Sequence, residues 1–215
     1  MNLNKYIEHT LLKQDATKAD ITKLLDEAIQ YDFLGVCVNP CNVKYAKEYL
    51  KNSDVKVVTV IGFPLGQNTK EIKILETIDA IKNGADEIDM VINVGLLKDK
   101  AYDAIVDEIS AIKGACQGHN LKVILETDLL TQDEIKKACE LCIEAKADLV
   151  KTSTGFVKNG VGAKAEDVAL MFNTVKDAGM QVKASGGIRD KEAALKMIEA
   201  GAVRLGTSSG VKIVS

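Results

Sequence analysis

Short β-branched runs alternate with amphipathic stretches along nearly the whole chain. Runs rich in Val, Ile and Thr predict strands at 6–12, 34–39, 55–63, 87–93, 121–127, 149–154, 181–185 and 203–209. Between them, apolar residues recur three and four positions apart, which predicts helices at 19–29, 42–50, 72–82, 102–113, 132–145, 165–178 and 191–200. The chain is therefore a series of strand–helix units.

The junctions from helix to strand resemble one another. The segments NGADEID, AKADLVK, AGMQVK and AGAVRL each place glycine or a small residue where a helix ends. Single helices between parallel strands require right-handed crossovers, and eight such units can close into a barrel. We predict an α/β fold, a (β/α)8 TIM barrel, with residues 1–215 forming a single domain. The alternative is an open doubly wound sheet, but no G-x-G-x-x-G turn follows a strand.

Composition and charge narrow the possible partners. The 215 residues are 47% hydrophobic and 27% charged, with a net charge of -3, so the chain has no general attraction to nucleic acid or to anionic membranes. No apolar run is long enough to span a bilayer, and the start MNLNKYIEHT lacks the apolar core of a secretion signal. We expect a cytoplasmic protein that acts on small molecules.

The cysteines do not indicate a disulfide framework or a zinc site. Their number is odd, and Cys139 and Cys142 form a C-x-x-C inside a helical pattern with no second pair to complete a metal site. We therefore predict that these two side chains pack within a helix. The only histidines are His9 and His119, and we expect no metal and no cofactor.

Two lysines occupy matching positions at the ends of predicted buried strands. Lys151 lies in DLVKTSTG, residues 148–155, and Lys183 lies in QVKASGG, residues 181–187. One such lysine would be explained by an outward orientation or by pairing with a carboxylate. Two at matching strand ends favour a site, because burial and like charge both lower the proton affinity of an amine. One of them can then act as a free amine.

A free lysine amine attacks carbonyl compounds and forms an iminium, which is the chemistry of Schiff-base (class I) aldolases. Such a reaction also needs an acid and base, and Asp89 in EIDMVIN supplies a carboxylate at another strand. The alternative on the same barrel is a phosphosugar isomerase that uses a carboxylate base such as Glu126. A sugar-phosphate sensor without catalysis is a third hypothesis.

Three loops in the second half of the chain suit a phosphate group. They follow the sixth, seventh and eighth predicted strands, where barrels commonly bind phosphate through backbone N–H groups. The candidate phosphate-binding residues are Gly155, Gly186, Gly187, Ser208 and Ser209. Ser208 and Ser209 would add hydroxyl donors, or would cap a helix. A phosphorylated substrate follows from this pattern.

Taken together, these motifs resemble the deoxyribose-phosphate aldolase family. The similarity runs through EHTLLKQDAT, GVCVNP, VVTVIGFPLG, GADEIDMVIN, KVILET, LVKTSTGF, VKASGGIR and RLGTSSGVKIV. It implies reversible cleavage of 2-deoxy-D-ribose 5-phosphate to D-glyceraldehyde 3-phosphate and acetaldehyde, a place in deoxyribonucleotide catabolism, and a homodimer or larger assembly.

The resemblance also implies roles for individual residues. Lys151 would form the Schiff base, Lys183 would depress its proton affinity, and Asp89 would relay protons through water. Cys37 is similar to a pocket-lining cysteine of the family, although the sequence alone favours a small core residue.

The chain departs from the family in two places. Glu8 stands where the family commonly has aspartate, so a polar contact at the mouth of the first strand is expected to differ in reach. Some members continue beyond the last strand into a helix and a tail ending in tyrosine, so we expect an incomplete last outer helix here.

Overall fold

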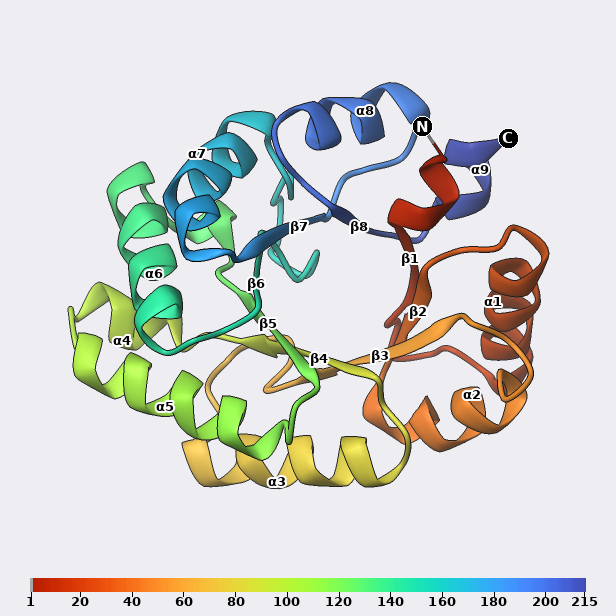
Figure 1. The fold of residues 1–215 in the computed structure, drawn as a ribbon, viewed down its shortest axis with the longest axis horizontal. Coiled ribbons are helices and arrows are strands. Elements are labelled where there is room, and N and C mark those ends of the chain that lie inside the picture. Colours follow the sequence, from red (N-terminus) through yellow and green to blue (C-terminus); the bar gives the residue numbers. More distant parts are fainter. Residues whose placement is uncertain (1) are drawn as a thin grey trace.

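The computed structural model describes residues 2–215, and a closed barrel of parallel strands forms its centre (Figure 1). Neighbouring strands follow the order of the sequence, and the last strand pairs with the first. The strands are β1 (Ile7–Leu11), β2 (Gly35–Val38), β3 (Lys56–Ile61), β4 (Glu87–Val91), β5 (Asn120–Ile124), β6 (Leu149–Lys151), β7 (Gln181–Ser185) and β8 (Arg204–Thr207). The predicted TIM barrel is confirmed.

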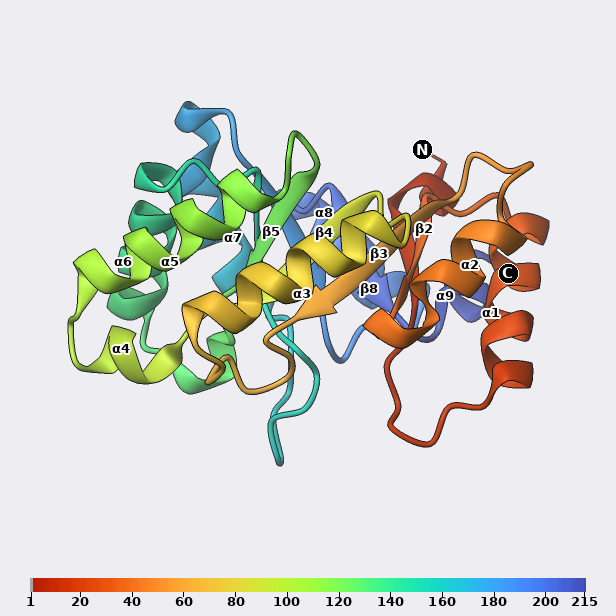
Figure 2. The same cartoon turned by 90° about the horizontal axis from the view of Figure 1, so that it is seen from below.

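Helices form a layer around the strands (Figures 1 and 2). They are α1 (Lys18–Gln30), α2 (Val43–Tyr49), α3 (Lys70–Lys82), α4 (Val94–Lys98), α5 (Tyr102–Ala115), α6 (Gln132–Glu144), α7 (Ala165–Val175), α8 (Lys191–Glu199) and α9 (Gly210–Val214), with short 3-10 turns η1 (Leu3–Tyr6), η2 (Pro40–Asn42), η3 (Thr127–Leu129) and η4 (Lys176–Ala178). Helices α4 and α9 were not predicted. The five residues of α9 make the last outer helix short, as expected.

Local signals explain where the outer helices begin and which face they bury. Thr17 and Thr131 form capping boxes at the starts of α1 and α6, in which each threonine side chain accepts a backbone N–H bond. In α1 the buried residues Ile21, Leu24, Leu25 and Ala28 recur at helical spacing and face the barrel. None of the helices within residues 2–215 is both long enough and apolar enough to cross a membrane.

The barrel strands are buried on both faces, but their two faces differ in chemistry. Valine, isoleucine and leucine side chains form a large cluster that packs against the helices. Charged side chains are also buried on the strands, and they are Glu8, Glu87, Asp89, Lys122, Lys151 and Lys183. Burying charge is unfavourable unless opposite charges are paired. The interior of the barrel is therefore the place to look for a site.

Candidate active site

Lys151 and Lys183 lie side by side on neighbouring strands. They are direct partners in the register of β6 and β7, and their relative exposures are 3% and 0%. Gly206 on β8 makes room for the second lysine, since a Cβ atom there would lie 3.0 Å from Lys183 Cε. Both amines therefore project into the barrel, as the sequence pattern predicted.

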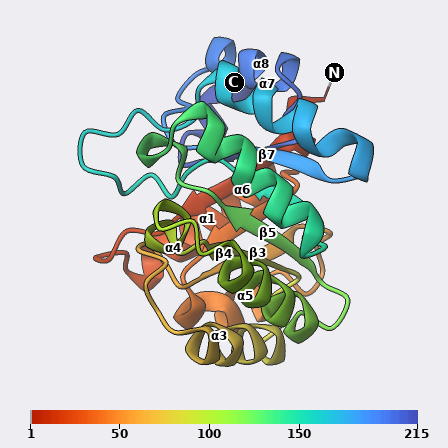
Figure 3. The ribbon, with the colours of Figure 1, turned by 90° about the vertical axis from the view of Figure 1, so that its left-hand side faces the viewer.

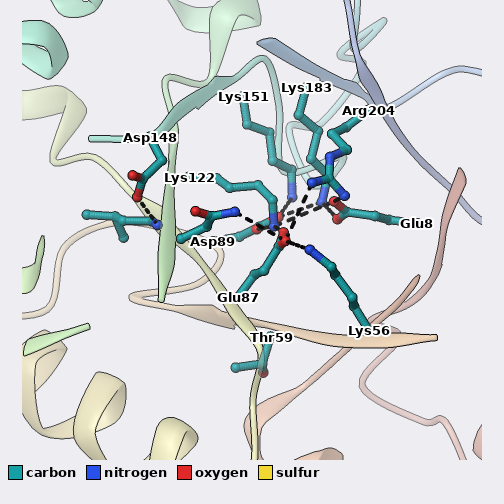
Figure 4. Close-up of polar contacts among 12 residues, drawn as sticks. Glu8, Lys56, Thr59, Glu87, Asp89, Lys122, Asp148, Lys151, Lys183 and Arg204 are labelled. Atoms are coloured by element: carbon teal, nitrogen blue, oxygen red, sulfur yellow. Dashed lines mark hydrogen bonds and ion pairs between the residues drawn. The ribbon is translucent and has the colours of Figure 1, made fainter. Parts of the chain in front are cut away.

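Asp89 on β4 holds the two amines together. Lys151 Nζ donates to Asp89 Oδ2 at 2.8 Å, and Lys183 Nζ donates to the same oxygen at 2.7 Å. The other oxygen, Oδ1, accepts a hydrogen bond of 2.9 Å from Lys122 Nζ (Figure 4). One buried carboxylate therefore contacts three lysines, and the two predicted catalytic amines meet at a single oxygen atom.

Two further carboxylates balance this concentration of positive charge (Figure 4). Glu8 on β1 pairs with Lys183 and lies 3.5 Å from Lys122 Nζ. Glu87 on β4 lies 2.7 Å from Lys122 Nζ and also accepts a 2.8 Å hydrogen bond from Lys56. The result is a buried network of alternating charges rather than two isolated ammonium groups.

The network fixes the charge of its central members. Burial alone would raise the pKa of Asp89, but the positive charges of Lys122, Lys151 and Lys183 outweigh it and hold that pKa well below its usual range. Burial lowers the pKa of Lys183, yet the negative charges of Asp89 and Glu8 outweigh that effect and raise it. Asp89 is therefore an anion and Lys183 a cation at neutral pH.

The position of Glu8 corrects one expectation. We expected its contact at the mouth of the first strand, but Glu8 lies within β1, fully buried, opposite Gly35 and Gly206. From there its carboxylate reaches across to Lys183. Glu8 is thus part of the charged network, and its environment is the barrel interior rather than the solvent-facing opening.

Sequence reasoning also missed four members of the network, Lys56, Glu87, Lys122 and Arg204, the last of which lies 3.5 Å from Glu87. The sequence analysis considered the carboxyl ends of the strands, whereas Lys56, Glu87 and Arg204 each begin a strand and Lys122 is the middle residue of β5. Lys122 shows the same sequence pattern as Lys151, a lysine next to apolar residues of a strand, here Leu121 and Val123. A search for this pattern along the whole of each strand would have identified Lys122.

A cavity of about 300 Å³ opens above the network. Lys151 lines it together with four of the predicted phosphate-binding residues, Gly155, Gly186, Gly187 and Ser208. Ser209 instead borders an adjacent cavity of about 780 Å³ between β1, α1 and α9, and its backbone N–H donates to Thr207 Oγ1 at 2.9 Å. Four of the five residues therefore share one cavity with the lysine.

Two glycines of the cavity have backbone conformations that suit glycine. Gly186 and Gly187 have φ values of +85° and +75°, in the left-handed region. A Cβ atom on Gly187 would lie 2.3 Å from the carbonyl oxygen of Val161, so any side chain there would collide with the loop after β6. These glycines allow the two loops to pack backbone to backbone.

Glu126 supports the loop after β6 instead of facing the cavity as a free base. Its φ is +61°, and its carboxylate accepts from both the backbone N–H and the hydroxyl of Thr154. Burial raises its pKa, although the bonds from Thr154 act in the opposite direction. Both oxygens of Glu126 are therefore already engaged, which disfavours the isomerase alternative.

The remaining expected residues have structural positions. Cys37 is buried in a small apolar cluster with Leu12, Val58 and Val60, and burial raises the pKa of its thiol. Cys139 and Cys142 are buried free thiols in α6, as predicted. Within residues 2–215 the His, Cys, Asp and Glu side chains form no group of three or more suited to a metal ion.

The sequence matches the DeoC/LacD family aldolases over residues 4–215. The chain belongs to this family. It is 58% identical to a deoxyribose-phosphate aldolase of Finegoldia magna over 214 residues, which span 100% of this chain and 99% of that protein. The predicted resemblance to deoxyribose-phosphate aldolases is confirmed.

Other members of the family agree in sequence and in fold. A deoxyribose-phosphate aldolase 1 of Staphylococcus aureus (strain MRSA252) is 57% identical over 214 residues, covering 100% of this chain and 96% of that protein. The tetrameric deoxyribose phosphate aldolase of Aeropyrum pernix superposes with a TM-score of 0.91 at 36% identity, covering 99% of this chain and 89% of that chain. The similarity therefore extends over the whole barrel.

Proposed function

We propose that the protein is a deoxyribose-phosphate aldolase that works through a Schiff base on Lys151. It would cleave 2-deoxy-D-ribose 5-phosphate reversibly to D-glyceraldehyde 3-phosphate and acetaldehyde. The observation that carries this proposal is the meeting of Lys151 and Lys183 at one oxygen of Asp89, beneath a cavity lined by glycine-rich loops. Membership of the aldolase family supports it.

The chemistry begins at the aldehyde carbon, C1. The neutral amine of Lys151 adds to C1 and gives a carbinolamine, which loses water to form an iminium. A base removes the proton from the C3 hydroxyl, the C2–C3 bond breaks, and its electron pair passes into the enamine as glyceraldehyde 3-phosphate leaves. Protonation of the enamine at C2 and hydrolysis of the resulting iminium release acetaldehyde and restore the amine.

Asp89 and Lys183 are suited to move the protons of these steps. Lys183 is held as a cation 2.7 Å from Asp89, so a positive charge lies beside the amine of Lys151. Asp89 contacts Lys151 directly, so it can pass protons between the amine and a water molecule in the cavity. We assign Lys151 as the nucleophile, Asp89 as the proton relay, and Lys183 as the group that favours the free amine.

The phosphate of the substrate would bind at the opposite side of the cavity from Lys151. Gly155, Gly186 and Gly187 are partly or fully exposed there and offer backbone donors, and Ser208 offers a hydroxyl. Ser209 lies in the neighbouring cavity, so its contact with phosphate stays a prediction from the sequence. The action of the enzyme in the cytoplasm and in deoxyribonucleotide catabolism likewise stays a prediction.

Covalent trapping tests the proposal. Incubation with acetaldehyde and borohydride should leave one ethyl group on Lys151, located by peptide mass analysis. The Lys151→Leu variant is the control and should remain unmodified. An unmodified wild-type Lys151 combined with interconversion of sugar phosphates would overturn the aldolase proposal in favour of an isomerase.

We also propose that the protein assembles with copies of itself, through the outer face of α3. This helix buries Lys73, which donates to Glu108 at 2.8 Å, yet leaves Ile72, Leu75 and Ile78 exposed by 45%, 59% and 44%. The three apolar residues are spaced evenly about Leu75, so two antiparallel copies would bring Ile72 against Ile78 and Leu75 against itself.

The oligomer proposal is tested by molar mass. Light scattering should show a multimer for the wild type and a smaller species for Leu75→Glu. The control is Leu129→Glu, because Leu129 is also exposed, by 47%, but lies in η3. A wild-type monomer, or an equal effect of both substitutions, would overturn the proposal.

A further inference from the structure

The loop between β6 and α7 carries an aromatic residue to the cavity that contains Lys151. This loop is drawn in teal near the middle of the strand ring in Figure 1, and it projects from the body of the molecule in Figures 2 and 3. Phe156 follows the phosphate-site residue Gly155 and lines the cavity, although its side chain is 50% exposed. A half-exposed phenylalanine at a cavity is available to contact a ligand.

The ring of Phe156 packs against that of Phe63, which follows a strand on another part of the ring. The two ring centroids are 5.2 Å apart with an interplanar angle of 84°, the edge-to-face geometry that aromatic pairs favour. Phe63 follows β3, whereas Phe156 follows β6, three strands further around the barrel. The pair therefore spans part of the barrel opening.

The ring of Phe63 packs on buried apolar side chains. It packs against the small cluster of Leu12, Cys37, Val58 and Val60 that fills this side of the barrel. Leu12 also lines the cavity, so the cluster reaches the same space as Phe156. One wall of the cavity is thus apolar and faces the polar loops that carry Gly186 and Gly187.

The two ends of the loop are held by carboxylates from the segment after β5. Glu126 accepts two hydrogen bonds from Thr154, and the backbone N–H of Phe156 in turn donates to Thr154 Oγ1 at 3.1 Å. Asp128 accepts from the backbone N–H of Gly162 at 2.8 Å. Phe156 is therefore carried by a loop fastened on both sides, so that the position of its ring is limited.

The far end of the same loop rests on the phosphate-site glycines. Ala163 donates to the carbonyl oxygen of Gly186 at 3.0 Å, and Gly162 approaches Gly186 so closely that a Cβ atom on Gly162 would lie 2.4 Å from its carbonyl carbon. The loop thus connects the phosphate-site backbone to the aromatic pair. Phe156 lines the same cavity as Lys151 and these glycines, so a substrate that spans them binds in a space that the ring borders.

We propose that Phe156 is a specificity-determining residue whose ring covers the carbon chain of the substrate between the iminium on Lys151 and the phosphate. Phe63 is a positioning residue that acts through Phe156. This inference rests on the proposed aldolase function, and it adds an apolar contact to the polar ones. The ring also displaces water from the carbon chain, which strengthens the binding of aliphatic aldehyde phosphates.

Steady-state cleavage kinetics of 2-deoxy-D-ribose 5-phosphate test the inference. We expect Phe156→Ala to raise KM about tenfold, equivalent to about 1.4 kcal/mol of lost contact, with a smaller change in kcat. Phe156→Leu should recover most of the affinity, since it restores apolar area. The matched control is Val161→Ala, because Val161 is 59% exposed in the same loop and does not line the cavity.

The role of Phe63 is tested by a double-mutant cycle. Phe63→Ala should raise KM by a smaller factor than Phe156→Ala, and combining the two should add little, since Phe63 acts through the other ring. Phe63→Tyr should restore KM, because the ring edge is retained. A melting curve for each variant shows whether the fold is intact. If Phe63→Ala unfolds, Phe156→Ala decides the test, because Phe156 is half exposed and its replacement should leave the fold intact.

The outcomes separate this inference from the proposed function. Equal KM values for Phe156→Ala and Val161→Ala, in an enzyme whose wild type cleaves the substrate and is trapped on Lys151, would overturn the role of Phe156 alone. Additive effects of Phe63→Ala and Phe156→Ala would overturn the positioning role of Phe63. A wild type without cleavage or trapping would overturn the aldolase proposal, and the present inference with it.

Discussion

Removing the buried amine of Lys122 should destabilise the protein strongly, and Lys122→Met is the variant of choice. Lys122 is 0% exposed and contacts Asp89 at 2.9 Å and Glu87 at 2.7 Å. Methionine fills similar space without a charge. The substitution therefore leaves two buried carboxylate oxygens without their cation, whereas the rest of the packing is kept.

The expected magnitude follows from these contacts. Breaking a buried ion pair by removing one partner costs about 3–5 kcal/mol, since an uncompensated charge stays buried. For a chain of this length each kcal/mol lowers Tm by roughly 2–4 °C, so we expect Tm to fall by roughly 6–20 °C. Lys151 and Lys183 still neutralise part of Asp89, which places the loss nearer the lower limit.

Thermal unfolding followed by circular dichroism at pH 7 measures this loss. The matched control is Lys51→Met, because Lys51 contacts Glu48 at 2.7 Å but both side chains are largely exposed. Such a surface pair adds little to stability, so the control should melt like the wild type. If Lys122→Met also melted within 2 °C or so of the wild type, the buried network would not contribute as argued here.

Three further predictions concern catalysis and acid stability. Lys151→Leu should abolish turnover but retain phosphate binding by calorimetry, and residual turnover would remove Lys151 as nucleophile. Lys183→Leu removes the neighbouring cation, so its pH–rate profile should move to alkaline pH; an unmoved optimum would contradict that role. The pKa of Glu87 lies at about 2 when folded, below its ordinary 4.5, because Lys122, Lys56 and Arg204 outweigh the effect of burial. The ionised Glu87 therefore contributes about 3 kcal/mol to the free energy of unfolding above pH 4.5, and this contribution is lost as the pH falls towards 2. The free energy of urea unfolding of Glu87→Gln should therefore vary less with pH in this range than that of the wild type. An equal pH dependence in the two proteins would refute the role of Glu87.

Much of the barrel was predictable because its strands and helices follow local patterns. Val, Ile and Thr runs identified all the strands, and the seven longer helices had apolar residues at helical spacing. The strand at 149–154 was predicted too long, since β6 ends at Lys151. Beyond it, the side chain of Thr152 bonds to Ser185 O, a contact between segments that no local pattern contains.

The site was predictable only where a residue was unusual for its position in a strand. Lys151, Lys183 and Asp89 stood out as charges in predicted buried strands, and the structure brings them together. The partners of Lys122 and Glu8 depend on which strands face each other across the barrel. That information comes from closure of the ring, so their pairing could not be deduced from neighbouring residues in the chain.

Glu8 and Lys183 are separated by 175 positions in the sequence, yet their side chains are in contact. This contact requires β8 to pair with β1, which happens only after most of the chain has left the ribosome. Contacts this distant in sequence slow folding, because the intervening chain must be ordered before they can form. During synthesis, therefore, the charged interior is completed late, when β8 has emerged and closed the ring beside β1.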